Sequence, residues 1–232
     1  MKALLLAAGF GTRLRPLTET IPKCLVPING QPLLDIWLEQ LLDAGIGPFL
    51  INTHYLPDQV EGYVKKSRYK EMITLAYEPD LLGTAGTVRG AADFFGNEDG
   101  LLIHADNYCL ANFKAFLHVH ASKPPDILLT MMTFRTQNPK LCGIVEVNKE
   151  KRVIDFYEKV DNPPSDLANG AVYILPNELI KFIVNSNYSD FSTEVIPGLL
   201  GKIITFENES IHIDIGTISE YKRANGIKEK KV

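Results

Sequence analysis

The sequence has little cysteine and no long apolar run, and both absences exclude classes of protein. Its 232 residues include three cysteines, Cys24, Cys109 and Cys142, which are odd in number and far apart. This spacing excludes a disulfide framework and a cysteine metal site, so we expect reduced, structural thiols. No apolar stretch approaches the ~20 residues needed to span a bilayer. The sequence therefore predicts a protein that has no membrane partner.

An excess of positive charge is also missing. The chain carries 24 Lys and Arg residues against 28 Asp and Glu residues, for a net charge of −4. This balance argues against a nucleic-acid partner. The basic residues Lys228, Lys230 and Lys231 are interpreted as a solvated tail. The apolar amino end is similar to the hydrophobic region of a signal peptide, but the charged Arg13 follows it directly. We therefore expect a cytoplasmic location.

Residues 3–27 are the most informative segment of the sequence. The apolar run Ala3–Ala8 leads into the turn Gly9-Phe10-Gly11, then into Thr12 and Arg13, with Lys23 ten residues later. Glycine lets the backbone approach a ligand, and free N–H groups suit phosphate oxygens. A guanidinium and an ammonium supply positive charge. The segment predicts a triphosphate-binding loop, whose candidate nucleotide contacts are Ala7, Ala8, Gly9, Gly11 and Thr12.

Two familiar glycine motifs do not fit this loop. A dinucleotide-binding fingerprint needs a third glycine where the chain has Leu14, and its acidic ribose ligand is missing from residues 30–34. A phosphate-binding loop of the Walker A type ends in Gly-Lys-Ser/Thr, but this one continues Thr12-Arg13-Leu14. Both motifs are excluded.

The loop instead resembles that of the sugar-1-phosphate nucleotidylyltransferases. Their pattern G-x-G-T-R-L-x-P-L-T, followed by P-K-x-L-V-P, is matched by residues 9–18 and 22–27. Cys24 departs from it, since the family usually has proline there. The resemblance implies that Arg13 and Lys23 are catalytic and stabilise charge on the phosphates. For Arg15, contact with the leaving pyrophosphate and simple solvation stay equally open.

The alternation of strand and helix in the first half predicts an α/β fold. We expect a Rossmann-like, GT-A-like nucleotidyltransferase with a mostly parallel mixed sheet and helices on both faces. One domain should cover residues 1–226, with a nucleotide-binding half (1–110), a sugar-phosphate-binding half (111–226) and a tail (227–232). We also expect no room for the hexapeptide-repeat coil of larger members. The expected helices are 32–45, 57–66, 83–95, 178–184 and 193–200, and the expected strands are 49–51, 73–77, 101–104, 127–134, 144–147, 153–157 and 171–175.

Two aspartates follow or end apolar strands. Asp106 comes after Leu101–His104, and Asp214 ends the alternation Ile211–Asp214 before Gly216. Ligands of such sheets bind at the carboxyl ends of strands, and Mg²⁺ takes one or two protein carboxylates. Taken alone, either aspartate could be a turn or cap residue. Together with the loop motif they resemble the family's metal ligands, so we predict a Mg²⁺ cofactor. His104 is interpreted as a packed residue rather than a nucleotide contact.

The remaining candidate sites depend on the resemblance. Glu158-Lys159 is similar to the family's F-x-E-K element, Asn169-Gly170 to its N-G segment, and Gly143 to a glycine beside the sugar ring. These five residues are the predicted sugar-phosphate site, although Glu158 and Lys159 could also be a surface pair. The string E-P-x-x-L-G-T-A-G resembles the base-binding segment of GDP-mannose pyrophosphorylases. It makes Glu78, Gly83, Thr84 and Ala85 candidate nucleotide contacts.

The resemblance implies an enzyme that joins GTP to a mannose- or D-glycero-D-manno-heptose-type sugar 1-phosphate and releases pyrophosphate. Its partners would be the nucleoside triphosphate and the sugar 1-phosphate, and a homo-oligomer stays compatible with the sequence. A UTP- or dTTP-dependent hexose or amino-sugar enzyme is the alternative within the class. A nucleotide-sugar-sensing regulatory subunit is the alternative outside it.

Overall fold

The computed structural model describes residues 1–227 as an α/β protein with two compact units. The glycine-loop unit comprises Leu5–Leu81, His104–Ala111 and the chain from Ser210 onward. The strand-rich unit comprises Met1–Leu4, Leu82–Ile103 and Asn112–Glu209. Strand β1 (Lys2–Leu6) has residues in both units. The predicted basic tail, Lys228–Lys231, lies outside the described residues.

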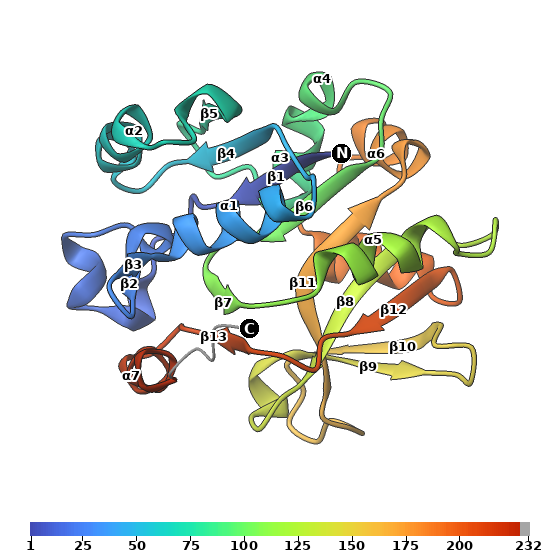
Figure 1. Cartoon of the computed structure of the whole chain (residues 1–232). Helices are drawn as coiled ribbons and strands as arrows, with labels where there is room; N and C mark the ends of the chain where they lie inside the picture. The colour runs from blue at the N-terminus through green and yellow to red at the C-terminus, as the bar shows by residue number, and fades with distance from the viewer. Residues whose placement is uncertain (228–232) are drawn as a thin grey trace. The chain divides into compact units, whose positions relative to one another are not determined.

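The glycine-loop unit is built from parallel strands and helices. Strand β4 (Phe49–Thr53) is buried along its whole length and pairs in parallel with β5 (Ile73–Tyr77). The connection between them is α2 (Pro57–Lys66), which contacts β5 (Figure 1). A parallel pair requires such a crossover, which explains the strand–helix–strand pattern of the sequence. Helix α1 (Leu33–Asp43) buries one apolar face that includes Trp37.

Short elements complete this unit. Strand β13 (His212–Asp214) pairs antiparallel with β7 (Asn107–Cys109), so that Asp214 lies opposite Asn107. Strands β2 (Pro27–Ile28) and β3 (Gln31–Pro32) form a small hairpin, and α7 (Ile218–Gly226) follows β13. The β7–β13 pair joins segments about a hundred residues apart, and it determines where two of the predicted site residues lie.

The strand-rich unit is mainly antiparallel. Its long strand β11 (Leu167–Leu175) pairs antiparallel with β6 (Gly100–His104), β8 (Leu129–Arg135) and β9 (Gly143–Val147). Strand β10 (Val153–Glu158) pairs with β9, and β12 (Ile203–Glu207) runs parallel to β8 (Figure 1). Its helices are α3 (Thr84–Gly90), α4 (Ala92–Phe95), α5 (Phe113–Ala121) and α6 (Asn177–Val184).

The predicted α/β class is confirmed, and so are most of the elements. The bounds of α2 and β5 match the prediction. The helix expected over 193–200 is wrong as an α-helix, because a π-helical turn (Phe191–Val195) gives way to a 3₁₀ turn (Ile196–Leu199). Pro197 has no N–H and Gly198 disfavours a regular helix, which accounts for the break. The domain division proposed from the sequence stays a prediction.

The cysteines and the lengths of the helices can be read from the structure. All three cysteines are free, and Cys24 and Cys109 are buried. Burial raises the pKa of the Cys24 thiol to about 12, so the thiol is protonated and unreactive at neutral pH. Within residues 1–227, no helix has both the length and the apolar character that crossing a bilayer demands.

Candidate active site

The glycine turn after β1 has one glycine where a side chain would be strained and one glycine whose surroundings are open. Gly11 has φ of +62°, and a Cβ there would lie 2.9 Å from Cγ2 of Thr18. The Thr18 hydroxyl donates to the Gly11 carbonyl at 2.7 Å, which closes the loop on itself. At Gly9, by contrast, a Cβ would meet nothing within 4 Å. The backbone at Gly9 is therefore open to an approaching ligand, as a phosphate-binding loop requires.

Aromatic residues after β4 hold this loop, and the sequence analysis did not single them out for that role. The Phe10 ring lies edge-on to His54 with centroids 5.2 Å apart, and it also contacts Tyr55 at 5.6 Å. The Tyr55 hydroxyl donates to the Thr18 carbonyl at 2.8 Å. Both ends of the turn are thus fixed from one neighbouring segment. The aromatic pair His54-Tyr55 directly after an apolar strand was the available signal.

A buried hydrogen-bond chain links Ala7 to Glu78. The Ala7 N–H donates to Oδ1 of Asn52 at 2.7 Å, and Asn52 Nδ2 donates to Glu78 Oε1 at 3.0 Å. The Glu78 carbonyl lies 2.8 Å from Nδ1 of His54. Asn52 therefore connects two predicted nucleotide contacts, and the N–H of Ala7 is already engaged. Asn52 directly follows the strand expected over 49–51, and no role was predicted for it.

Four charged groups converge beside the loop. Lys23 Nζ lies 2.9 Å from Asp106 Oδ2 and 3.2 Å from Asp214 Oδ1. Arg13 Nη2 lies 3.3 Å from Asp214 Oδ2. The Lys23 side chain is only 6% exposed, whereas those of Asp106 and Asp214 are 42% and 43% exposed. The structure thus brings the predicted metal ligands and both predicted catalytic cations to one place in the glycine-loop unit.

The local fold explains this convergence. Asp106 follows β6 by two residues and immediately precedes β7, while Asp214 ends β13. Because Asp214 lies opposite Asn107 in the β7–β13 pair, it is brought next to Asp106. Because Gly216 has no side chain, the Arg13 guanidinium can approach Asp214. A Cβ there would lie 2.9 Å from an Arg13 guanidinium nitrogen and 3.0 Å from Asp214 Oδ1.

The opposite charges within the cluster stabilise one another's ionised forms. Burial alone would lower the pKa of Lys23, but the facing carboxylates of Asp106 and Asp214 outweigh it and the pKa is raised. Burial alone would raise the pKa of Asp106, but the Lys23 ammonium and His104 outweigh it and the pKa is lowered. At neutral pH Lys23 is therefore an ammonium ion and Asp106 a carboxylate.

The two carboxylates fit a magnesium ion better than a softer metal. Both already contact one shared cation, the Lys23 ammonium, so their oxygens point at a common position. In the described part of the chain no group of three or more His, Cys, Asp or Glu side chains could hold a metal ion. A donor set of two carboxylates, completed by water and substrate phosphate, is what Mg²⁺ usually takes.

The predicted sugar-phosphate residues lie together in the strand-rich unit. Glu158 lies opposite Gly143 in the β9–β10 pair, and a Cβ at Gly143 would lie 2.7 Å from Glu158 Oε2. Ala168 lies opposite Ile144, which places Asn169 of β11 beside the same end of β9. Lys159 Nζ pairs with Glu158 Oε1 at 3.0 Å. Gly170 follows Asn169 in β11. These residues therefore lie close together around the first residue of β9, at neighbouring positions in β11 and at the end of β10.

The segment Gly83–Ala85 begins α3 and is fixed to the loop 189–191. Gly83 has φ of +76°, and a Cβ there would lie 2.3 Å from the Ser189 carbonyl oxygen. That carbonyl accepts a hydrogen bond from Ala85 N–H at 2.9 Å, and the Thr84 hydroxyl accepts one from Phe191 N–H at 2.6 Å. The N–H of Ala85 is thus engaged within the protein, so a nucleotide contact here needs other atoms.

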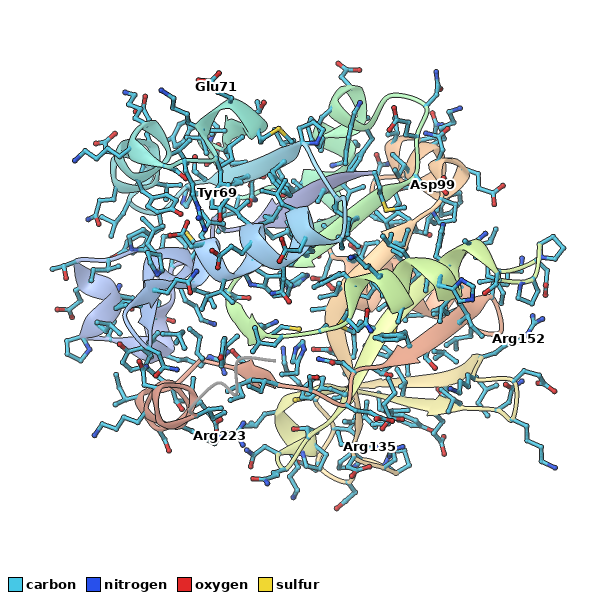
Figure 2. All side chains as sticks on the ribbon, viewed as in Figure 1. Tyr69, Glu71, Asp99, Arg135, Arg152 and Arg223 are labelled. Atoms are coloured by element: carbon cyan, nitrogen blue, oxygen red, sulfur yellow. The ribbon has the colours of Figure 1, made fainter. Side chains whose placement is uncertain are left out.

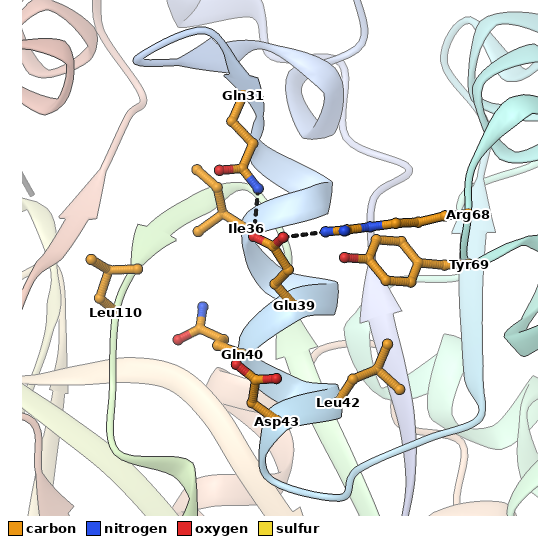
Figure 3. Close-up of a pocket in the computed structure, with 9 residues that line it drawn as sticks. All are labelled: Gln31, Ile36, Glu39, Gln40, Leu42, Asp43, Arg68, Tyr69 and Leu110. Atoms are coloured by element: carbon orange, nitrogen blue, oxygen red, sulfur yellow. Dashed lines mark hydrogen bonds and ion pairs between the residues drawn. The ribbon is translucent and has the colours of Figure 1, made fainter. Parts of the chain in front are cut away.

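A separate pocket of about 550 Å³ lies beside α1 and contains none of the predicted site residues (Figure 3). Its charged groups are largely paired with one another. Glu39 accepts a hydrogen bond from Gln31 Nε2 at 2.7 Å and forms an ion pair with Arg68. The Arg68 guanidinium also lies over the Tyr69 ring, 4.7 Å from its centroid. This internal pairing leaves the pocket without the cationic groups that a triphosphate requires.

Comparison with known proteins gives the family. The model of the nucleotidyl transferase family matches residues 2–231, so the chain belongs to that family. The chain is 31% identical over 228 residues to the mannose-1-phosphate guanylyltransferase of Mycobacterium tuberculosis, covering 96% of this chain and 63% of that protein. It is 26% identical to the UTP–glucose-1-phosphate uridylyltransferase of Synechocystis sp., covering 97% of this chain and 62% of that one.

Solved structures agree with the family. The structure of HddC from Yersinia pseudotuberculosis in complex with GMP-PN superposes with a TM-score of 0.80 at 25% identity, covering 97% of each chain. The α/β fold predicted from the alternation of strand and helix is therefore shared with that solved structure. The chain spans somewhat less than two thirds of the length of the curated relatives that it matches.

Proposed function

We propose that the protein is a guanylyltransferase that joins GTP to a mannose- or manno-heptose-type sugar 1-phosphate and releases pyrophosphate. The observation that carries the proposal is the convergence of Arg13, Lys23, Asp106 and Asp214 beside a glycine turn. Two carboxylates and two cations at one point suit a reaction that moves negative charge among phosphates. The mannose-1-phosphate guanylyltransferase relative supports the choice of substrates.

In this proposal an oxygen of the sugar 1-phosphate attacks the α-phosphorus of GTP. A new P–O bond forms, the bond between the α-phosphorus and the bridging oxygen breaks, and pyrophosphate leaves. The open backbone at Gly9 admits the phosphates, and Arg13 stabilises the charge that develops on them. Lys23 holds the α-phosphate or the attacking phosphate. Asp106 and Asp214 would hold a Mg²⁺ ion, which when bound would supply positive charge to offset that of the phosphate oxygens.

The other predicted residues select the substrates. Within the glycine-loop unit, Glu78 and its partner Asn52 are proposed to contact the guanine base. Within the strand-rich unit, Gly83 and Thr84 at the start of α3 stay proposed nucleotide contacts. Lys159 is proposed to bind the sugar phosphate and Glu158 the sugar hydroxyls, beside Gly143 and Asn169. A polar site that hydrogen-bonds hydroxyl groups rejects analogues that lack them. This arrangement would give the enzyme its sugar specificity.

Pyrophosphate release tests the proposal. The purified protein is incubated with GTP, UTP or dTTP and with mannose, manno-heptose or glucose 1-phosphate, in each case with Mg²⁺ and with chelator. We expect release to be fastest with GTP and a manno-configured sugar phosphate, and to stop with chelator. Faster release with UTP and glucose 1-phosphate would favour the uridylyltransferase alternative, which the Synechocystis relative supports. Nucleotide binding without release in every combination would favour a sensor.

A further inference from the structure

The cluster of charged residues in the glycine-loop unit contains a cation of its own. The Lys23 ammonium contacts both Asp106 and Asp214, at 2.9 and 3.2 Å, and its side chain is almost fully buried. A buried ammonium that bridges two carboxylates occupies the position that a metal ion bound by the same oxygens would take. The Lys23 ammonium would therefore compete with a metal ion for the same carboxylate oxygens.

An ammonium and a metal cannot share these oxygens. Magnesium binds carboxylate oxygens at roughly 2.1 Å, which would place it well inside contact distance of a Lys23 Nζ that stayed in position. Two cations so close would also repel each other strongly in a partly buried site. A metal that binds the two oxygens that Lys23 now contacts must therefore displace the ammonium from at least one of them.

The Lys23 side chain has somewhere to go. Lysine carries its charge on a flexible four-carbon stem, so Nζ can swing without moving the backbone. The stem begins beside the glycine turn, since Lys23 Cβ lies 3.4 Å from the position of a Cβ on Gly11. An ammonium released from Asp106 and Asp214 can therefore pair with a phosphate held by that turn.

We propose that Lys23 is a resident counter-ion that is exchanged for the metal: it occupies Asp106 and Asp214 until Mg²⁺ displaces it toward the triphosphate. The inference rests on the proposed function for the identity of the metal and of the triphosphate. It implies that the free protein binds Mg²⁺ weakly. It also implies that a phosphate that accepts the released ammonium tightens metal binding.

The test measures metal binding by the free protein, without nucleotide or sugar. Mg²⁺ is titrated calorimetrically into the wild type, Lys23→Met and Lys23→Arg. Removing the competing charge should tighten binding about 10-fold or more in Lys23→Met. Lys23→Arg keeps the charge and should stay within about threefold of the wild type. Lys65→Met is the matched control, because Lys65 also forms an ion pair, with Glu61, but on the exposed face of α2. It should leave the affinity unchanged.

Equal or weaker Mg²⁺ binding by Lys23→Met, or no detectable binding by any variant, would overturn the proposal. Should Lys23→Met fail to fold, lysine side-chain NMR of the wild type decides instead. The Lys23 ammonium signal, identified by its loss in Lys23→Arg, should move on Mg²⁺ titration while that of Lys65 stays. A Lys23 signal that is unchanged at metal saturation contradicts the exchange. Because no arm measures turnover, the proposed function can fail while this inference holds, and the reverse.

Discussion

The two units treat their charged residues in opposite ways. In the glycine-loop unit the Lys23 side chain is buried and contacts both Asp106 and Asp214, so one cation withdrawn from solvent joins two carboxylates that are themselves partly exposed. In the strand-rich unit Arg135 pairs with Asp166 and Glu207, and Arg152 with Asp126, where most of these side chains are well exposed (Figure 2). Exposed pairs contribute little to stability or chemistry, because water screens them. The contrast teaches that the number of ion pairs does not locate a site, whereas their burial and convergence do.

The largest effect should come from the two carboxylates of the glycine-loop unit. Asp106→Asn or Asp214→Asn keeps the shape of the side chain but removes the charge that would hold the metal. We expect either change to lower kcat for pyrophosphate release about 10³-fold, since metal stabilisation of phosphate charge is worth several kcal/mol. Asp126→Asn is the control from the strand-rich unit, because Asp126 also pairs with an arginine. A normal rate in either site variant would remove that residue from the metal site.

The next effect compares two arginines of similar exposure. The Arg13 side chain is 64% exposed and that of Arg135 is 54% exposed, and each pairs with carboxylates. Arg13→Gln should lower the chemical step about 10²- to 10³-fold, because it removes a donor to the transferring phosphate. Arg135→Gln should leave it unchanged, and both should melt close to the wild type. Single-turnover kinetics make the comparison, and equal rates for the two variants would deny Arg13 its role.

A smaller effect is expected at the proposed sugar-phosphate site. Lys159→Met removes the ammonium that pairs with Glu158 and is proposed to bind the sugar phosphate. Loss of one charge-assisted hydrogen bond should raise KM for the sugar 1-phosphate about 10- to 100-fold, with KM for GTP unchanged. Lys181→Met, on α6 of the same unit, is the control and should change neither constant. A rise in KM for GTP instead would move Lys159 to the nucleotide site.

The last predicted effect is on stability and concerns two glycines of the strand-rich unit. Gly83→Ala would place a Cβ 2.3 Å from the Ser189 carbonyl at φ of +76°. We expect a loss of about 3 kcal/mol, or a melting temperature lower by about 10 °C. At Gly198 a Cβ would meet nothing within 4 Å, so Gly198→Ala should change stability by less than about 0.5 kcal/mol. Equal melting temperatures for the two variants would mean that the loop 189–191 moves aside without a cost in stability, which contradicts the prediction.

Local patterns in the sequence predicted much of the fold. The helix expected over 57–66 and the strand expected over 73–77 have the bounds of α2 and β5 in the structure. Such elements are determined by neighbouring residues. The antiparallel pairs of β11 could not be predicted in this way, because each depends on a partner distant in the chain. Pro197 lies inside the helix expected over 193–200, and its missing N–H accounts for the 3₁₀ turn found there instead.

The candidate site was predicted as a set of residues but not as an arrangement. The loop motif and the strand-end positions selected Arg13, Lys23, Asp106 and Asp214. The β7–β13 register that joins the two aspartates has no local sequence signal. Nor did the sequence indicate that Lys23 would pair with the carboxylates, since its charge suits a phosphate equally well. Asn52 was missed because its role depends on which backbone groups fold against it.

The central claim is that Asp106 and Asp214 act together on one cation. It is tested most directly by kcat/KM for pyrophosphate release in Asp106→Asn, Asp214→Asn and the double variant. If both hold the same ion, either single change already removes it, and the double variant should lose no more than about tenfold beyond the worse single variant. Losses that multiply in the double variant would mean that the two carboxylates act independently, which contradicts the account.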